Sequence, residues 1–387
     1  MGGLSETEGG FQVREMKTAV QITMFRTINQ GSALQTYALH TKLQELGYRC
    51  LTIDYPRQMG RFLEKRTVRT FLLKLWNALL YWRRNRHYAR FLREELNLTR
   101  EYWAPEALAN DPPVADLYVT GSDQTFNSSI PSWDPSYMLS FVPRDRRATV
   151  RKIAYASSFA TESIPERWKD AVPALLKDYD AISTREANGV EIVRKLTGRC
   201  DAMWCCDPTI LLNRDEWRVF AAKARRRIRG KYILVYLLTY AVDPYPAADR
   251  LIAEAQMATG YEVIYLLGRK KDMFRPHSRI VKNADTYEFV DLFLNASLII
   301  TSSFHGAAFS IQSGNPFMAM VHGDARTDDR VRSLLERVGA EKNAIDVPIA
   351  DSIHFDSLEK WRQPDGVVGR LEQFRQESFA WLKEKGS

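Results

Sequence analysis

Cysteine and histidine are scarce in this chain. The 387 residues include four cysteines and six histidines. Cys200, Cys205 and Cys206 lie close together, but they do not form a CxxC pair and no histidine stands near them. The length excludes a small secreted disulfide framework, and no metal site is expected. Free thiols in a reducing cytoplasm fit this cysteine pattern best.

The sequence also lacks a hydrophobic run that is long enough to cross a bilayer. The longest run, FLLKLWNALLYW at residues 71–82, contains Lys74 and is shorter than the roughly 20 residues that a membrane helix needs. The first residues show no apolar signal core, and residues 1–16 are expected to form a loose tail. We therefore expect a cytoplasmic protein.

Positive charge is in moderate excess. The chain has 55 Lys and Arg against 47 Asp and Glu, for a net charge of +8. This balance favours anionic partners such as phosphates or lipid headgroups, although a surplus of this size is also common in proteins without such a partner. No motif of a nucleic-acid-binding module accompanies the charge, so nucleic acid is not an expected partner.

Residues 57–103 differ in character from the rest, being basic, aromatic and helical in pattern. We interpret this stretch as an insertion that lies outside the sheet. Two interpretations of its role are open. Residues 60–95 have the composition of a helix that lies on an anionic membrane surface, at the inner face of the plasma membrane. They are equally consistent with a helical hairpin that packs on the core.

Elsewhere, strand-like and helix-like segments alternate. The pattern strand, helix, strand over residues 18–55 is typical of a right-handed parallel crossover. The same alternation resumes after the basic stretch AKARRRIRGK at residues 222–231. The sequence therefore predicts an α/β protein with two Rossmann-like domains facing each other across a cleft. The expected boundaries are 17–225 and 231–350, followed by a helical extension over 351–387.

One histidine stands at the end of a predicted strand, in LIITSSFHGAAF. Ligands of open α/β sheets bind beyond the carboxyl ends of the strands, so His305 is expected to face the cleft. An imidazole side chain can donate or accept a proton in general acid–base chemistry, Gly306 permits close approach, and the helix that follows favours an anion. The alternative is a histidine that only caps its own helix.

A second strand end, VTGSDQTFN, carries Asp123, a candidate to accept a hydroxyl proton. Helix capping by this aspartate or its neighbours is the competing interpretation. A glycine-bearing turn, TINQGSALQTYAL, also belongs to the expected cleft, although it lacks a GxGxxG motif. The residues expected to bind an acceptor with hydroxyl groups are Asn29, Gly31, Ser32, Gln35, Gly121, Ser122, Gln124 and Asn127.

The third strand end is ISTREANGV, where Arg185 precedes a predicted helix. An arginine at this position presents a planar fork to a phosphate or a carboxylate. An ion pair within the protein is the alternative. Arg330 and Arg332 precede another predicted helix, where they either neutralise an anion or lie on a solvated face.

Six stretches taken in order resemble the polysaccharide pyruvyl transferase family. They are NQGSALQTYAL, ADLYVTGSDQTFN, KIAYASSFA, ISTRE, CDPTILL and ITSSFHGAAFSIQSGNPF, and together they span most of residues 18–340. The second box has Phe126 where the family pattern has tryptophan. An ordered set of boxes is far more specific than any one of them.

The resemblance implies a GT-B-like arrangement and transfer of a pyruvyl group from phosphoenolpyruvate to two sugar hydroxyls of a bacterial-type polysaccharide or lipid-linked precursor, forming a ketal. It implies that Arg185 and His305 contact phosphoenolpyruvate. Ketal formation needs a proton donor and a proton acceptor, and we expect His305 to be the acid and Asp123 to be the candidate base. No cofactor is implied. Ser303 stands where other members have an arginine, so another cation is expected to replace it. The residues expected at the donor are Arg185, Ser303, Phe304, Gly306, Arg269 and Arg330.

Two other functions compete with this interpretation. The first is a GT-B glycosyltransferase that uses a nucleotide sugar, with Glu288 as the carboxylate that binds the ribose. The second is a non-catalytic, glycan-binding subunit of a polysaccharide assembly complex, with the basic segment as its working surface.

Overall fold

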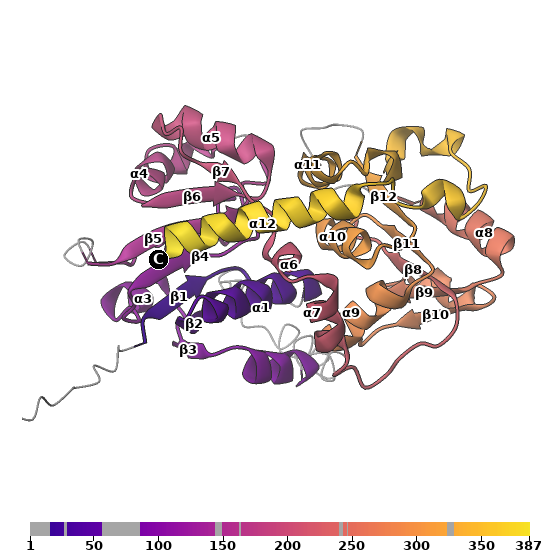
Figure 1. Cartoon of the computed structure of the whole chain (residues 1–387), viewed down its shortest axis with the longest axis horizontal. Helices are drawn as coiled ribbons and strands as arrows, with labels where there is room; N and C mark the ends of the chain where they lie inside the picture. The colour runs from indigo at the N-terminus through magenta and orange to yellow at the C-terminus, as the bar shows by residue number, and fades with distance from the viewer. Residues whose placement is uncertain are drawn as a thin grey trace, which may run out of the picture.

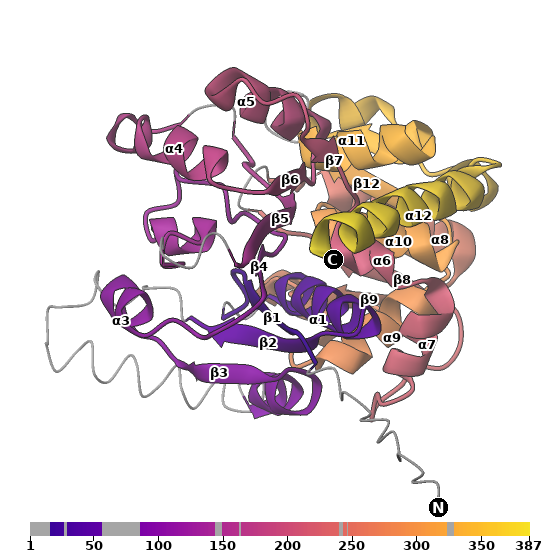
Figure 2. The same ribbon diagram turned by 60° about the vertical axis from the view of Figure 1, so that its left-hand side comes forward.

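The computed structural model describes residues 16–26, 29–55, 86–143, 149–161, 164–239, 243–245, 247–322 and 329–387. Within these ranges the chain forms two parallel β-sheets, each flanked by helices (Figures 1 and 2). The predicted α/β class with two Rossmann-like units is confirmed. No helix in this part of the chain is long and apolar enough to span a membrane.

The first sheet has seven strands in the order β3-β2-β1-β4-β5-β6-β7. Its central strands are hydrophobic and buried along their length, as expected for a parallel sheet covered on both faces. Its strands are β1 (Thr18–Ile22), β2 (Arg49–Asp54), β3 (Leu98–Glu101), β4 (Leu117–Thr120), β5 (Arg151–Ser157), β6 (Ala181–Thr184) and β7 (Met203–Trp204).

Strand β3 corrects one prediction. It pairs in parallel with β2, with Leu98 opposite Thr52, so residues 98–101 belong to the sheet rather than to an insertion outside it. An edge strand that is only partly buried has little hydrophobic pattern, which is why the sequence did not reveal it. Residues 86–95 are helical. Residues 56–85, which carry most of the predicted basic insertion, lie outside the described residues.

The second sheet has six strands in the order β10-β9-β8-β11-β12-β13. In both sheets the strand order reverses beside the first strand of the unit, between β1 and β4 and between β8 and β11, where such folds bind ligands. Its strands are β8 (Tyr232–Tyr236), β9 (Glu262–Leu266), β10 (Ser278–Val281), β11 (Leu298–Thr301), β12 (Phe317–Val321) and β13 (Ala344–Asp346).

The helices complete both units. Those that follow strands of the first sheet are α1 (Gln30–Glu45), α3 (Pro105–Asn110), α4 (Ala171–Lys177), α5 (Ala187–Thr197), α6 (Pro208–Leu211) and α7 (Arg214–Ala221). Those of the second unit are α8 (Ala247–Thr259), α9 (Thr286–Asn295), α10 (Phe304–Ser313), α11 (Asp329–Val338) and α12 (Val367–Gly386).

Aromatic packing joins the two units. Helix α7 contacts α9 through Phe220 and Tyr287, whose ring centroids are 4.7 Å apart, and α10 through Trp217 and Phe309 at 5.1 Å. Helix α12 runs along both units (Figure 1), and the Cys206 amide donates to its Ser378 hydroxyl at 2.9 Å. These contacts hold the carboxyl end of the second sheet against that of the first.

Candidate active site

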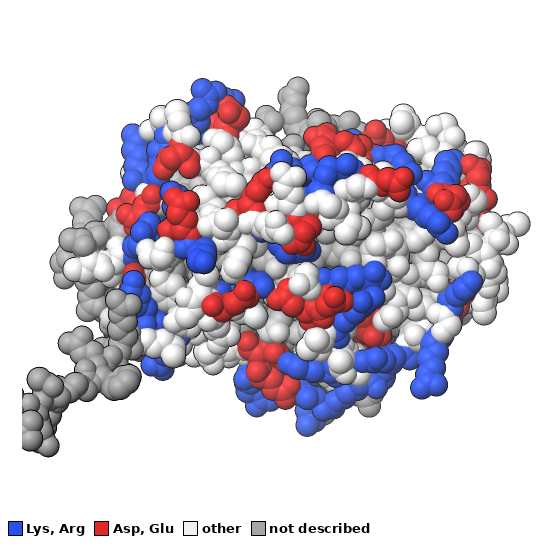
Figure 3. All heavy atoms as spheres, in the orientation of Figure 1, with Lys and Arg blue, Asp and Glu red and all other residues white. Residues whose placement is uncertain are grey.

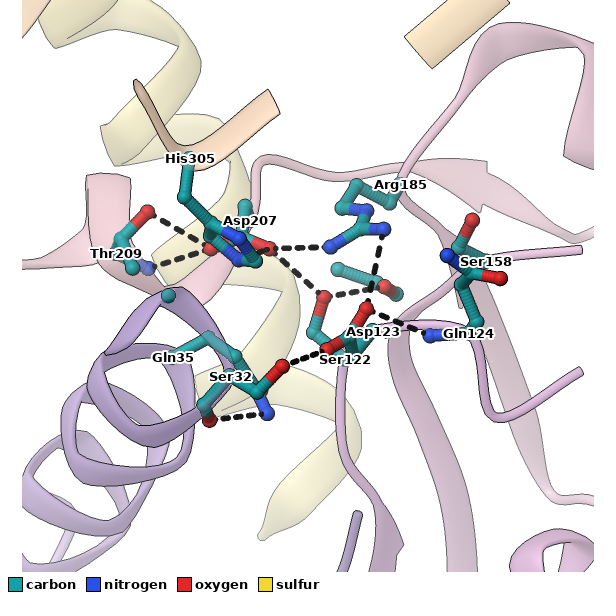
Figure 4. A network of polar contacts seen from close by, with 12 residues as sticks. Ser32, Gln35, Ser122, Asp123, Gln124, Ser158, Arg185, Asp207, Thr209 and His305 are labelled. Carbon is teal, nitrogen blue, oxygen red and sulfur yellow. Dashed lines mark hydrogen bonds and ion pairs between the residues drawn. The ribbon is translucent and has the colours of Figure 1, made fainter. Parts of the chain in front are cut away.

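Four ionisable side chains converge where the two sheets meet (Figure 4). Asp123 follows β4, Arg185 follows β6, and Asp207 is the residue before α6. His305 comes from the other unit, in the first turn of α10. Each side chain lies beyond a strand end because parallel strands present their carboxyl ends at one edge of the sheet. We call these four residues the ion cluster.

Arg185 and Asp207 form a fully buried ion pair at the centre of the cluster. The Nη1 atom of Arg185 donates to Asp207 Oδ2 at 3.0 Å, and both side chains have no exposed surface. The Ser122 hydroxyl donates to the same oxygen at 3.1 Å. Asp207 Oδ1 caps α6 by accepting from the Thr209 amide at 2.9 Å. The guanidinium carbon lies 4.4 Å from the ring centroid of Phe304, so one face of the cation is covered by an aromatic ring.

The charges of this pair stabilise each other. Burial lowers the pKa of Arg185, but the carboxylates of Asp123, Asp207 and Glu186 raise it by more. Burial raises the pKa of Asp207, but His305, Arg185 and the Thr209 amide lower it well below its usual range. Both groups are therefore charged at neutral pH.

Asp123 is held in an uncommon backbone conformation. Its φ is 70°, a left-handed value that non-glycine residues seldom adopt and that concentrates at functional sites. Oδ2 accepts from the Ser32 hydroxyl at 2.6 Å, and Oδ1 lies 3.6 Å from Arg185 Nη2. Its side chain is 13% exposed, the most open of the four. Asp123 is thus the member of the cluster best placed to meet a hydroxyl group.

The structure corrects the prediction that His305 faces an open cleft. The residue is only 6% exposed, because its ring packs against Gly31 at the start of α1. The Nε2 atom lies 3.7 Å from Asp207 Oδ2, which is too long for a hydrogen bond. The alternative, that His305 caps its own helix, does not hold either, since the Ser303 hydroxyl accepts from the Gly306 amide at 3.4 Å.

Three nitrogen atoms of the cluster are buried without a hydrogen-bond partner among the described residues. They are Nε and Nη2 of Arg185 and Nε2 of His305. Buried polar groups are almost always hydrogen-bonded, and leaving one unpaired costs roughly 1–3 kcal/mol. Unpaired nitrogens of a cation and an imidazole beside one carboxylate point to a polar or anionic ligand.

Three of the residues predicted to bind the acceptor are instead part of the scaffold. Gln35 is fully buried, and its amide donates to Thr23 Oγ1 at 2.9 Å. Ser122 is fully buried and bonds the Ala156 carbonyl as well as Asp207. Gly121 lies close to Thr23, which leaves no surface for a ligand. Sequence position alone did not separate cleft residues from the layer behind them.

Of the other predicted acceptor residues, Asn29 and Gln124 are partly exposed, and Gly31, Ser32 and Asn127 are buried. Asn29 caps α1 and lines an apolar cavity of about 200 Å³. Ser32 reaches Asp123, as described above. Gln124 and Asn127 bond each other, with Asn127 Nδ2 donating to Gln124 Oε1 at 2.8 Å. Gly31 contributes the surface on which His305 lies.

The two arginines proposed to replace the missing cation at Ser303 lie in different places. Arg269 belongs to a separate group, in which it pairs with Asp272 at 3.0 Å and Asp249 and stacks on Tyr245. The charge of Arg330 acts on Glu186, the residue after Arg185, and lowers its pKa, although burial raises that pKa by more. Arg330 is therefore the better placed of the two.

Asp207 is the residue of the site that the sequence did not single out. It lies in CDPTILL, where an aspartate before Pro208 is typical of a helix N-cap. It does cap α6, but only with one oxygen, and the other faces Arg185 and His305. Because the capping role already accounts for an aspartate at this position, the sequence shows no sign of its second role in the ion cluster. Within the described ranges, no group of three His, Cys, Asp or Glu side chains is arranged to hold a metal.

The fold is that of GT-B glycosyltransferases and related epimerases. The structure is similar to a putative UDP-N-acetylglucosamine 2-epimerase from Listeria monocytogenes, with a TM-score of 0.53, 11% identity, and 96% of this chain and 91% of that chain covered. It is also similar to the glycotransferase of kitacinnamycin, with a TM-score of 0.51, 12% identity, and 95% and 96% covered. The model of the polysaccharide pyruvyl transferase family matches residues 29–324. The chain belongs to this family. A comparison with curated proteins finds no significant match.

The close contact between Gly31 and His305 predicts that Gly31→Ala destabilises the protein. A methyl group at Gly31 would lie 2.2 Å from His305 Nδ1, so the ring or the helix must shift. We expect a loss of about 1–3 kcal/mol in the free energy of unfolding, measured by urea denaturation. Gly369→Ala on α12 is the control, because its methyl group meets nothing within 4 Å. Equal stability of the two variants would contradict the tight contact.

The buried ion pair predicts that Asp207→Asn lowers the free energy of unfolding by an amount that depends on pH. Because the folded pKa of Asp207 is depressed, its stabilisation is complete above the unfolded pKa of about 3.9 and is lost as pH falls below it. At pH 7 the variant should lose roughly 3–5 kcal/mol, since Arg185 loses its partner. The loss should shrink toward pH 3. Asp365→Asn on the surface is the control, and a pH-independent difference for Asp207→Asn would refute the linkage.

Proposed function

We propose that the chain transfers a pyruvyl group from phosphoenolpyruvate to two hydroxyls of a sugar, in a bacterial-type polysaccharide or a lipid-linked oligosaccharide precursor. The observation that carries the proposal is the set of unpaired buried nitrogens on Arg185 and His305 in a chain of this family. Phosphoenolpyruvate has a carboxylate and a phosphate within three carbons. The fork of Arg185 suits either group.

The residues present match the needs of ketal formation. A proton from His305 Nε2 adds to the methylene carbon of the donor, and C2 becomes an oxocarbenium-like centre. A sugar hydroxyl attacks C2 and loses its proton to Asp123. Phosphate then leaves C2 with its bonding electrons and takes up the proton held by Asp123. A second hydroxyl attacks C2 and loses its proton to His305 Nε2, which closes the ring and restores the acid. Arg185 stabilises the anionic donor, and Asp207 holds Arg185 in place.

The proposal requires the interface to open before the donor binds. His305 belongs to the second unit and the other three members of the ion cluster belong to the first. Separation of α1 from α10 at Gly31 would expose all four side chains at once, as in hinged closure around a ligand. Closing would then exclude water from the reacting carbon.

The nucleotide-sugar alternative has less support. Glu288, the residue considered for the ribose, caps α9 and accepts from Nε and Nη2 of Arg226 at 2.9 Å each. Its carboxylate is thus already engaged. Nothing in the described ranges favours a non-catalytic glycan-binding subunit over an enzyme.

A transfer assay tests the proposal. The purified chain is incubated with phosphoenolpyruvate and a panel of acceptors that includes p-nitrophenyl hexopyranosides and glycosyl diphosphates, and both phosphate release and ketal formation are measured. We expect the two products in equal amounts with at least one acceptor. A parallel thermal-shift comparison uses nucleotide sugars. Stabilisation by a nucleotide sugar, with no response to phosphoenolpyruvate, would favour the glycosyltransferase instead.

We also propose that the protein works in the cytoplasm, at the inner face of the plasma membrane, through residues 60–95. In the described part of this segment, Arg86 and Arg93 are exposed. This arrangement would bring the site to a lipid-linked acceptor. Co-sedimentation with phosphatidylglycerol vesicles, using phosphatidylcholine vesicles as the control, tests it.

A further inference from the structure

A basic hollow lies on the surface between the helix of residues 86–95 and the chain that follows α7. Its volume is about 630 Å³, within the range of small-molecule sites. Figure 3 shows Lys and Arg side chains gathered at the lower edge of the molecule in that view. The residues that line the hollow are Arg86, His87, Arg90, Arg93, Glu94, Arg225, Arg226, Asn283 and Glu288.

Positive charge predominates among the residues that line the hollow. Five of them are arginines and two are glutamates. Glu94 is paired with Arg90 at 2.7 Å, and Glu288 with Arg226. Arg93 and Arg225 are exposed and form no hydrogen bond or salt bridge with any described residue. Two guanidinium groups are therefore available to a ligand.

The hollow is connected to the candidate active site by a short loop. Asn283 lines the hollow, and its neighbours Lys282 and Ala284 line the apolar cavity of about 200 Å³. Gln30 also lines that cavity, and its side-chain amide donates to the Ala284 carbonyl at 3.0 Å. Gln30 begins α1, and the next two residues of that helix contact His305 and Asp123. The hollow, the cavity and the ion cluster thus follow one another along the domain interface.

We propose that the hollow binds the diphosphate end of the acceptor, so that the substrate class is a glycosyl diphosphate rather than a neutral sugar. This inference rests on the proposed function. Arginine forks bind phosphate oxygens in pairs, and several of them suit a diphosphate. The cavity, with the aromatic rings of Tyr236 and Phe289 on its wall, would hold a sugar ring between the diphosphate and the reacting hydroxyls.

Binding of inorganic pyrophosphate to the full chain tests the hollow without any transfer reaction. Titration calorimetry compares wild type, Arg93→Gln with Arg225→Gln, and a control that removes the same charge from α5, Arg194→Gln with Lys195→Gln. We expect the dissociation constant to rise about tenfold or more in the first variant and less than about twofold in the control. Equal affinity in all three proteins would overturn the proposal.

Two further experiments are needed. The first distinguishes a diphosphate from a lipid headgroup as the anion that binds the hollow, and the second distinguishes failure of this inference from failure of the proposed function. If the Arg93 and Arg225 variant loses only its binding to phosphatidylglycerol vesicles, and retains pyrophosphate, the hollow is a membrane contact and the inference is wrong. In the transfer assay, KM for a glycosyl diphosphate should rise in this variant while KM for phosphoenolpyruvate stays unchanged. Loss of pyrophosphate binding without transfer to any acceptor would support the hollow and contradict the proposed function.

Discussion

Replacement of Arg185 by lysine should lower kcat/KM for phosphoenolpyruvate by about 10²-fold to 10⁴-fold. Lysine keeps the positive charge beside Asp207 but lacks the planar fork whose Nε and Nη2 atoms have no hydrogen-bond partner among the described residues. Each hydrogen bond to a charged group contributes about 1.5–3 kcal/mol, and two would be lost. The change should appear in both KM and kcat, measured by phosphate release.

Stability measurements separate this effect from misfolding. Because Arg185→Lys keeps the buried charge paired, its thermal midpoint should stay close to that of wild type. Arg185→Ala leaves Asp207 uncompensated and should lose roughly 3–5 kcal/mol. Arg194→Lys, on the exposed face of α5, is the control for the substitution itself. Near-normal kcat/KM in a folded Arg185→Lys protein would remove Arg185 from the donor site.

His305→Gln should lower kcat by about 10²-fold to 10⁴-fold and change KM for phosphoenolpyruvate much less. Glutamine places an amide nitrogen near the position of Nε2, so binding of the donor is largely kept, but it cannot transfer the proton to carbon. The fold should survive because Nε2 has no hydrogen-bond partner in the described part of the chain.

The control for His305→Gln is His354→Gln, which removes a surface imidazole of the same unit. Single-turnover measurements in deuterium oxide add a second readout. Wild type should show a solvent isotope effect on the step that protonates the methylene carbon. A His305→Gln protein with wild-type kcat would show that another group supplies the proton.

Much of the fold was predictable because local pattern and topology agree. Hydrophobic strands alternate with helices, and parallel crossovers then place strand ends such as those before Asp123 and Arg185 at one edge. Strand β3 was not predictable, because an edge strand that is only partly buried has no clear period. Its assignment depends on pairing with β2, which is a tertiary property.

The sequence singled out Asp123, Arg185 and His305 as candidates, but neither Asp207 nor the burial of the ion cluster was predictable. His305 is buried because Gly31, far away in sequence, lets α1 pack on its ring. The roles of Asp207, Arg269 and Arg330 likewise depend on which side chains meet across the interface. Sequence spacing holds no information about such contacts. The close contact between Gly31 and His305 is also why the proposed function includes opening of the interface.

A crystal structure of the protein with phosphoenolpyruvate tests the central claim most directly. We predict oxygen atoms of the ligand within hydrogen-bond distance of Arg185 Nη2, with its methylene carbon next to His305 Nε2 and the contact between Gly31 and His305 widened. A ligand bound elsewhere, with the ion cluster unchanged and closed, would contradict the account.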